Sequence, residues 1–458
     1  MVKLRITALL LVLLTALSLC SCQQSEDKKK KLVVYCVEAD KEYYVKNFNT
    51  YNNYCVAKGL GWDYQVEVMT FKNSSELNKK MTTEIMAGGG PDLFLTSQVL
   101  PFEKMVESEM FADINELAKQ KGASLDLSGY NENVMSCGVY DGKRYIVPLL
   151  YTPNASYAYS EALSSVGLEP KQNCALTYND TETLKKLSEK MDSLMLDYTG
   201  YTEEFFERFV CDYVDFEKKE VYFETDEFKK NIDLIKQLCV KYEERERKKI
   251  PDYYRRLPVK YLSYDGYQTP LFYSKIYTLP DSAKTFVYQT QAKKDSNITK
   301  TVYDRESADN SVVCRGIQRN KDEILGTVQL GVAVNKNSDK KEKALAFVEY
   351  GLSEYGQTHL TSPFNSAFSA MAVKKSVFDK RMQDASEVEA ENRELGLDSE
   401  IMKATVEVSK SVQKCSLGRE YYSKNIAGGL IRKYLAGQLP KYKFIRQLKT
   451  ATKFYLEE

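Results

Sequence analysis

The chain has 458 residues, of which 43% are hydrophobic, and its 65 basic and 64 acidic side chains leave a net charge of +1. This length predicts two or three domain-sized units with substantial cores. A nucleic-acid-binding protein would carry a strongly basic face, so the balanced charge argues against that class.

The first residues have the pattern of an export signal. A short basic start precedes the apolar run Ile6 to Leu19, which is typical of a secretory signal peptide. The run ends in LCSC, which resembles the lipobox of bacterial lipoproteins with Cys22 as the lipidated residue. We therefore predict a signal peptide at 1–21 and a lipid-anchored polar tether at 22–31, with an ordinary secretory signal as the alternative. No later segment has the roughly 18 uninterrupted apolar residues that a membrane span needs.

The cysteine pattern does not predict a metal site. Of the ten cysteines, eight follow Cys22, and none of these forms a C-x-x-C pair, so zinc is not expected. We expect neither a metal nor a cofactor. Cys36 and Cys239 lie in apolar patterns that are typical of buried thiols. Disulfides stay possible in an exported chain, but the sequence does not give their pairing.

The folded part begins by alternating strands and helices. Leu32 to Val37 is a continuous apolar run, as in a buried parallel strand. A helix follows, then a strand that ends near Val68, a second helix, and a short strand over 92–95. This order implies a parallel sheet with right-handed crossovers, and such sheets bind ligands beyond the C-terminal ends of their strands. The residues expected on the buried face of the first helix are Tyr44, Phe48, Tyr51 and Cys55.

The stretch EIMAGGGPDLFL, Glu84 to Leu95, places its glycines after a helix and before a strand. A phosphate-binding loop has the opposite order, with the glycines leading into a helix N-terminus. We therefore predict a turn, with Gly88 as the left-handed helix cap and Pro91 preventing the helix from resuming. Asp92 and the Glu38–Lys41 segment are the two charged clusters expected at the ligand-binding edge of the sheet.

Further along the chain, Asp141-Gly142 predicts a tight hairpin turn. Val214 to Leu238 reads as strand, turn and helix, and Val328 to Val334 alternates as a strand. Ser338 is positioned to cap the helix that follows, and the C-terminal region is helical.

Several segments carry a family resemblance: the lipobox, IMAGGGPDLFL, YDGKRYIVPLLY followed by YAYSEAL, VDFEKKEVYFETDEF, LGVAVNKNSDKKEKALAFVEYGLSEYGQ, and YLAGQL. In this order they resemble the extracellular solute-binding proteins of ABC importers, in the sugar-binding family related to maltodextrin-binding proteins. The resemblance covers most of the mature chain, and Tyr253 to Asn320 is the part that matches poorly.

The resemblance implies an α/β fold of two lobes, each a sheet flanked by helices, with a ligand cleft between them. Lobe 1 would comprise 32–150 and 331–358, and lobe 2 would comprise 151–330 and 359–458, with crossings near Tyr151 and Gly331. It also implies a monomer without enzymatic activity. Anchored by its lipid to the outer face of the cytoplasmic membrane, this protein would capture an oligosaccharide by hinge closure and deliver it to ABC permease subunits.

The expected binding residues suit a neutral sugar. Carboxylates accept strong hydrogen bonds from hydroxyls, and aromatic rings cover the apolar faces of pyranose rings. The family's second lobe commonly supplies a stacking tryptophan, whereas the single tryptophan here, Trp62, falls in the first lobe. The expected ligand-binding residues are Glu38, Asp40, Lys41, Asp92, Tyr151 and Tyr157.

Other functions fit parts of the same pattern. The carboxylates would also suit a polyamine or a cationic peptide. An exported glycoside hydrolase needs only two carboxylates, whereas a Ser-His-Asp triad would depend on the single histidine, His359. A lipoprotein that presents a solute to a signalling partner would share the fold.

Overall fold

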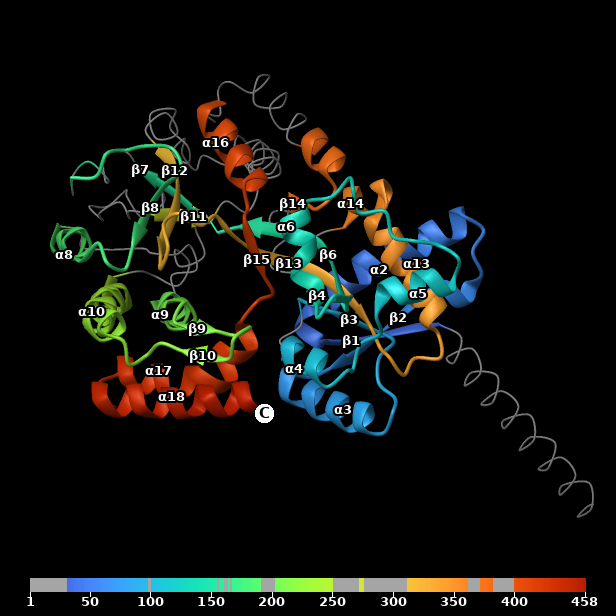
Figure 1. Ribbon diagram of the computed structural model, residues 1–458, viewed down its shortest axis with the longest axis horizontal. Helices are drawn as coiled ribbons and strands as arrows, with labels where there is room; N and C mark the ends of the chain where they lie inside the picture. Colours follow the sequence, from blue (N-terminus) through green and yellow to red (C-terminus); the bar gives the residue numbers. More distant parts are fainter. Residues whose placement is uncertain are drawn as a thin grey trace, which may run out of the picture.

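The computed structural model describes residues 31–97, 100–154, 156–159, 164, 167–190, 202–249, 272–275, 311–360, 371–381 and 399–458. They form two lobes, each with its own sheet and hydrophobic core (Figure 1). The predicted signal peptide, nearly all of the tether and most of 253–320 lie outside the described residues.

The sheet of lobe 1 has seven strands in the order β14-β6-β13-β3-β1-β2, with β15 paired to β13. β1 runs parallel to both β2 and β3, as the alternation of strands and helices predicted. β13 lies antiparallel between β3 and β6, so the sheet is mixed. The strands are β1 (Leu32–Val37), β2 (Val66–Phe71), β3 (Leu93–Leu95), β6 (Ile146–Pro153), β13 (Leu325–Val334), β14 (Met371–Ala372) and β15 (Lys414–Ser416).

Helices pack against this sheet and complete the first core. The predicted face of α2 is buried as expected, and the rings of Tyr51 and Phe347 meet edge to face at 5.0 Å. The helices are η1 (Glu38–Asp40), α2 (Lys41–Ala57), η2 (Trp62–Tyr64), α3 (Ser74–Met86), α4 (Phe102–Glu107), α5 (Ile114–Gln120), α6 (Glu132–Met135), η3 (Ser136–Gly138), α13 (Lys341–Leu352), α14 (Glu354–His359) and α16 (Ser399–Lys410).

The glycine run is a helix-to-strand turn, as predicted. The Asn73 side chain caps α3 by accepting the Glu76 N–H at 3.0 Å. At the other end Gly88 has a φ of +79°, and its N–H donates to the Ile85 carbonyl at 2.9 Å. A left-handed residue at this position ends the helix and frees the chain to enter β3.

The predicted hairpin is also present. β4 (Val139–Tyr140) and β5 (Lys143–Arg144) pair antiparallel across a two-residue turn. Asp141 and Gly142 both have positive φ, which is the geometry of a type I′ turn.

Lobe 2 is built on a smaller sheet in the order β11-β7-β12-β8. The helix predicted after Val214 is α10, and it buries Phe228, Ile232 and Ile235 completely. The elements are β7 (Ser156–Tyr159), β8 (Cys174–Thr177), α8 (Thr181–Lys190), α9 (Thr202–Cys211), β9 (Val214–Asp215), β10 (Glu220–Val221), α10 (Asp226–Lys249), β11 (Phe272–Lys275), β12 (Ser311–Gln318), η7 (Tyr422–Ala427), α17 (Gly428–Leu435) and α18 (Lys441–Glu457).

In the described residues, the chain passes between the lobes at three places, in the middle of Figure 1. The first two lie side by side, because the Asn154 N–H donates to the Leu325 carbonyl at 2.8 Å. The chain was predicted to pass from lobe 1 back to lobe 2 near His359, and this prediction is wrong. Beyond His359, β14 still pairs with β6 of lobe 1, and Val408 and Leu417 belong to the lobe 1 core. The last crossing therefore follows Leu417.

The predicted crossing near Gly331 is also displaced. Gly331 lies inside the lobe 1 sheet, where its N–H donates to the Thr96 hydroxyl at 2.7 Å. The crossing precedes Leu325, because β13 already pairs with β6 from Gly326 onward.

Candidate functional site between the lobes

Three charged residues follow β1 at the edge of lobe 1 that faces lobe 2, and we call them the acidic turn: Glu38, Asp40 and Lys41. Parallel pairing of β1 with β2 puts the ends of both strands, Val37 and Phe71, at this edge. Glu38 and Lys41 are exposed and Asp40 is half-buried. The acidic turn thus lies where ligands bind on parallel sheets.

Asp40 faces a charge from the other lobe. Burial raises the pKa of its carboxyl, and the positive charge of Lys424 partly opposes this rise. Lys424 is exposed and lies in η7, a π-helical segment that opens the last helical part of lobe 2. The two lobes therefore bring a carboxylate and an ammonium into electrostatic reach of each other. No sequence motif marked Lys424, because only the fold places it opposite Asp40.

The start of α2 is fastened to the end of β3. The hydroxyls of Tyr44 and Ser97 are 2.8 Å apart and both residues are buried. This hydrogen bond fixes the helix that follows the acidic turn against the sheet, so the backbone of the turn is held from both sides.

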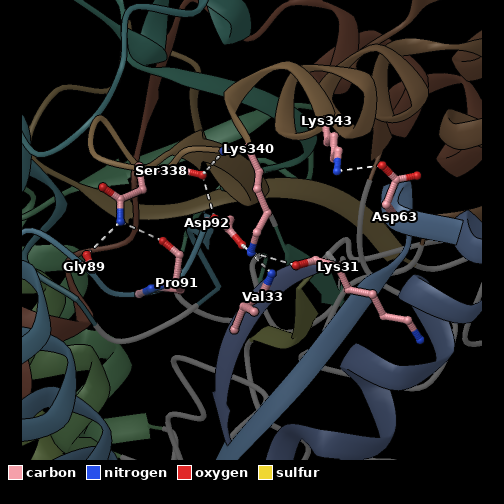
Figure 2. A network of polar contacts seen from close by, with 10 residues as sticks. Lys31, Val33, Asp63, Gly89, Pro91, Asp92, Ser338, Lys340 and Lys343 are labelled. Atoms are coloured by element: carbon pink, nitrogen blue, oxygen red, sulfur yellow. Dashed lines mark hydrogen bonds and ion pairs between the residues drawn. The ribbon is translucent and has the colours of Figure 1, made fainter. Parts of the chain in front are cut away.

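Asp92 lies at the opposite edge of the sheet, so the expectation that it joins Asp40 at the ligand-binding edge is wrong. Asp92 precedes β3, and parallel pairing with β1 places it beside Val33, near the start of β1. It is 5% exposed and accepts three hydrogen bonds (Figure 2). The donors are the Val33 N–H at 2.8 Å, the Ser338 hydroxyl at 2.6 Å and the Lys340 ammonium at 3.0 Å.

These contacts make Asp92 the centre of a structural network, which Figure 2 shows from close by. Lys340 also donates to the Lys31 carbonyl at 2.8 Å, and Asn335 donates to the carbonyls of Gly89 and Pro91 at 3.0 and 2.8 Å. The glycine run is thereby joined to the segment that follows β13.

Ser338 departs from its predicted role at the helix N-cap. α13 begins at Lys341, and its N-cap is Lys340, which makes no side-chain cap. The Ser338 hydroxyl instead accepts the Lys340 N–H at 3.0 Å and donates to Asp92. The hydroxyl thus accepts an N–H just ahead of the helix and donates its own proton to the buried carboxylate.

Tyr151 does not provide a stacking surface, which corrects the second predicted contact. It is 2% exposed, and its hydroxyl donates to the Ser409 carbonyl at 2.9 Å. Tyr157 lies in β7, where its backbone pairs with β12, but its side chain is outside the described residues. Trp62 is 61% exposed and lies under the Lys31 ammonium, 3.8 Å from the ring centre, which places it away from the acidic turn.

The lobes touch through α4. The Lys104 ammonium donates to the Leu456 carbonyl at 3.0 Å, and Lys219 forms an ion pair with Glu107 at 3.0 Å. Burial alone would raise the pKa of Glu107, but hydrogen bonds from Lys219 and Lys104 outweigh it and lower the pKa. The C-terminus accordingly lies beside α4 in Figure 1.

A partly buried arginine reinforces this contact. Arg419 is paired with Glu103 of α4, and its guanidinium lies 4.1 Å from the centre of the Phe216 ring. Burial lowers the pKa of Arg419 to about 10, so the side chain stays charged at neutral pH.

Within the described part of the chain, the contacts of the His359 side chain are local. Its Nδ1 lies 2.7 Å from the Tyr355 carbonyl and its ring stacks on Tyr355 with centroids 4.1 Å apart. Among the described residues no group of three potential metal ligands occurs. No helix in the described ranges has the length and apolar character to cross a bilayer.

Comparison with family models and with curated proteins returned no match. Comparison with solved structures found many similar folds. An ABC substrate-binding protein of Listeria monocytogenes in complex with cycloalternan has a TM-score of 0.52 and 15% identity, covering 93% of this chain and 98% of its own. The sugar-binding protein MalE of Xanthomonas citri has a TM-score of 0.58 and 12% identity, covering 93% and 97%.

A cyclic α-maltosyl-1,6-maltose binding protein of Arthrobacter globiformis is similar at a TM-score of 0.51 and 14% identity, covering 93% and 99%. These likenesses span nearly the whole chain and establish its fold as the two-domain periplasmic-binding-protein fold. The predicted α/β, two-lobed fold class is confirmed.

Proposed function

We propose that this protein is the solute-binding component of an ABC importer and that it captures an oligosaccharide outside the cell. One observation carries the proposal: the fold matches, over 93% of the chain, solved proteins whose names describe sugar binding. The same proteins are described as binding proteins rather than enzymes, which favours capture without turnover.

The acidic turn is the proposed contact of lobe 1 with the solute. Asp40 and Glu38 offer carboxylate oxygens that accept hydrogen bonds from sugar hydroxyls, and Lys41 adds a donor. From lobe 2, Lys424 lies within electrostatic reach of Asp40 and sits in a π-helical segment, a distortion frequent at functional sites. A solute between them would contact both lobes at once.

Closure by hinge bending follows from this placement. The described crossings join the lobes, which also touch through α4, so a rotation about the crossings changes the spacing between Asp40 and Lys424. A ligand that contacts both groups binds the closed arrangement better than the open one and shifts the population toward it. Scattering with saturating ligand is expected to show a smaller radius of gyration than without it.

Anchoring at Cys22 completes the proposal. The sequence LCSC supports lipidation, which would hold a monomer on the outer face of the cytoplasmic membrane beside its permease subunits. Mass spectrometry of the mature N-terminus is expected to show a lipid-modified cysteine. A mature chain that starts at any other residue would contradict the anchor while leaving solute binding open.

Calorimetry of the chain without its signal and tether tests the solute class. We would titrate neutral oligosaccharides, polyamines and short cationic peptides, and we expect heat only from a sugar. Asp40→Asn should weaken that binding at least tenfold, because a charge-assisted hydrogen bond contributes about 1.5 to 3 kcal/mol. Asp141→Asn is the matched control, since this residue lies in the β4–β5 turn and asparagine suits its positive φ.

Two outcomes would change the assignment. Tight binding of a polyamine or peptide without any response to sugars would leave the fold but replace the solute class. Release of reducing ends from a bound oligosaccharide would instead indicate a glycoside hydrolase, whose two carboxylates would have to be found.

A further inference from the structure

Two half-buried cysteines from distant parts of the chain meet near the last crossing between the lobes. Cys137 lies in η3, directly after α6, and Cys415 is the middle residue of β15. The two elements pack together, with Cα atoms of η3 and β15 within 8 Å of each other. This places the Cys137 thiol within interaction range of the Cys415 side chain and of the Leu417 backbone. The α6 helix and β15 also lie near each other in Figure 1.

A separate hydrogen bond holds the two segments in this arrangement. The Asn133 side-chain amide in α6 donates to the Val412 carbonyl, just before β15, at 2.9 Å. The contact between the thiols is therefore part of a packed junction with polar ties on both sides of it. A disulfide requires Cα atoms about 4.4 to 6.8 Å apart, a spacing that is compatible with the packing of η3 against β15.

We propose that Cys137 and Cys415 form a reversible disulfide that fastens β15 to lobe 1. Among the cysteines whose side chains the structure describes, Cys36 and Cys55 are buried in the first core. The Cys211 sulfur lies 3.5 Å from the Ser423 hydroxyl in lobe 2. No contact with another thiol is described for these three cysteines. Cys174, the remaining cysteine with a described side chain, pairs through its backbone in β8 with Cys314 of β12, whose side chain lies outside the described residues.

The position of the bond gives it a mechanical consequence. β15 pairs with β13 over Leu325 to Thr327, where the chain has just crossed from lobe 2, and it leads directly into the last crossing toward η7. A covalent link at Cys415 would prevent β15 from separating from lobe 1. Hinge bending at this crossing would then be confined to the residues between Leu417 and Tyr422.

The bond would form by thiol–disulfide exchange with an external disulfide. One protein thiolate attacks a sulfur of the external disulfide, giving a mixed disulfide and releasing one external thiol. The second protein thiolate then attacks the mixed bond and releases the other external thiol. The protein loses two electrons and two protons, and the external disulfide is reduced to two thiols.

The rate of this exchange should depend on pH. The hydrogen bond with Cys415, together with burial, raises the pKa of the Cys137 thiol well above its usual range. Since the thiolate is the reacting species, bond formation should accelerate from pH 7 to pH 9. Oxidation in the cell rests on the proposed export, whereas the purified protein tests the pairing without it.

Peptide mapping of the folded mature chain tests the proposal. The reduced protein is incubated with oxidised glutathione, the remaining thiols are alkylated, and the digest is analysed without reductant. We expect one linked peptide pair that contains Cys137 and Cys415, its loss after dithiothreitol, and a melting temperature several degrees higher in the oxidised protein. Cys137→Ser and Cys415→Ser should each abolish the linked pair and the thermal shift.

Cys211→Ser is the matched control, because serine can keep a hydrogen bond to Ser423, and this variant should retain the linked pair. If a cysteine variant fails to fold, alkylation of the folded wild-type chain before and after oxidation still decides the question. Both thiols remaining alkylatable after oxidation, or either one linked to a different cysteine, would overturn the proposal.

Discussion

Substitutions at Asp92 test whether its carboxylate stabilises the fold or contacts the solute. Its carboxylate accepts hydrogen bonds from Val33, Ser338 and Lys340, and the Lys340 ammonium is itself only 14% exposed. Asp92→Ala would leave that ammonium buried beside a cavity, with the Lys31 carbonyl as its remaining hydrogen-bond partner. Removing one partner of a buried ion pair costs about 3 to 5 kcal/mol.

The Val33 N–H and the Ser338 hydroxyl would lose an acceptor in the same variant. Each such buried donor costs about 1 to 3 kcal/mol when nothing replaces the acceptor, although these losses overlap with that of the ion pair. We therefore expect Asp92→Ala to destabilise lobe 1 by about 3 to 5 kcal/mol. Asp92→Asn keeps the shape and one acceptor oxygen, so it should cost less.

Urea unfolding of both variants measures this loss as a lower midpoint at constant slope. A double variant tests whether the ion pair causes the loss of stability. Asp92→Asn combined with Lys340→Met should lower the free energy of unfolding by less than the sum of the two single variants. Under native conditions the folded Asp92→Asn protein should bind its solute with unchanged affinity, because Asp92 lies at the edge away from the acidic turn.

A different pattern would refute this reasoning. If Asp92→Asn weakened solute binding strongly while the urea midpoint stayed the same, the carboxylate would be a ligand contact rather than a structural one. If Asp92→Ala cost less than about 1 kcal/mol, the network of Figure 2 would not contribute as a buried ion pair.

Three further predictions concern pH and backbone geometry. Hydrogen bonds from lysines hold the pKa of Glu107 below its ordinary value of 4.5. The ion pair with Lys219 should therefore persist at pH values above 4.5 and weaken as the pH falls through the depressed pKa. Scattering of the ligand-free protein should show the lobes separating in acid, and Glu107→Gln should remove that response. Burial raises the Asp212 pKa to about 6, so its ionisation destabilises the fold as pH rises from 4 to 7, by at most about 3 kcal/mol. In urea unfolding, the free energy of unfolding of Asp212→Asn should therefore fall less between pH 4 and pH 7 than that of the wild type. Gly88→Ala should cost about 1 kcal/mol because of its positive φ, whereas Gly89→Ala, which has negative φ and room for a methyl group, should be nearly neutral.

Local pattern was sufficient to predict most of the secondary structure. The spacing of Tyr44, Phe48 and Tyr51 identified a buried helix face, and Gly88 and Asp141-Gly142 identified turns, because each effect acts within a few residues. The class of fold followed from the order of these elements together with the family resemblance.

The site was harder to predict, because strand direction and long-range pairing decide it. Asp92 and Asp40 both flank strands, but one precedes its strand and the other follows, so parallel pairing sends them to opposite edges. Lys424 had no sequence signal, since it comes near Asp40 only through the last crossing. Tyr151 was misassigned because an apolar run in the sequence looks the same whether the strand is fully buried or lines a cleft. β6 is buried along its whole length.

The place of β13 in the lobe 1 sheet has a consequence for how the chain acquires its structure during synthesis. β13 lies between β3 and β6, yet the ribosome produces it only at residues 325–334, long after β3 at 93–95 and β6 at 146–153. Until β13 exists, these two apolar strands have no central partner and keep open edges to which other chains could add. Lobe 1 therefore cannot mature until the described strands of lobe 2, which precede β13, have also been made, and aggregation during production should increase with the time for which these edges stay unpaired.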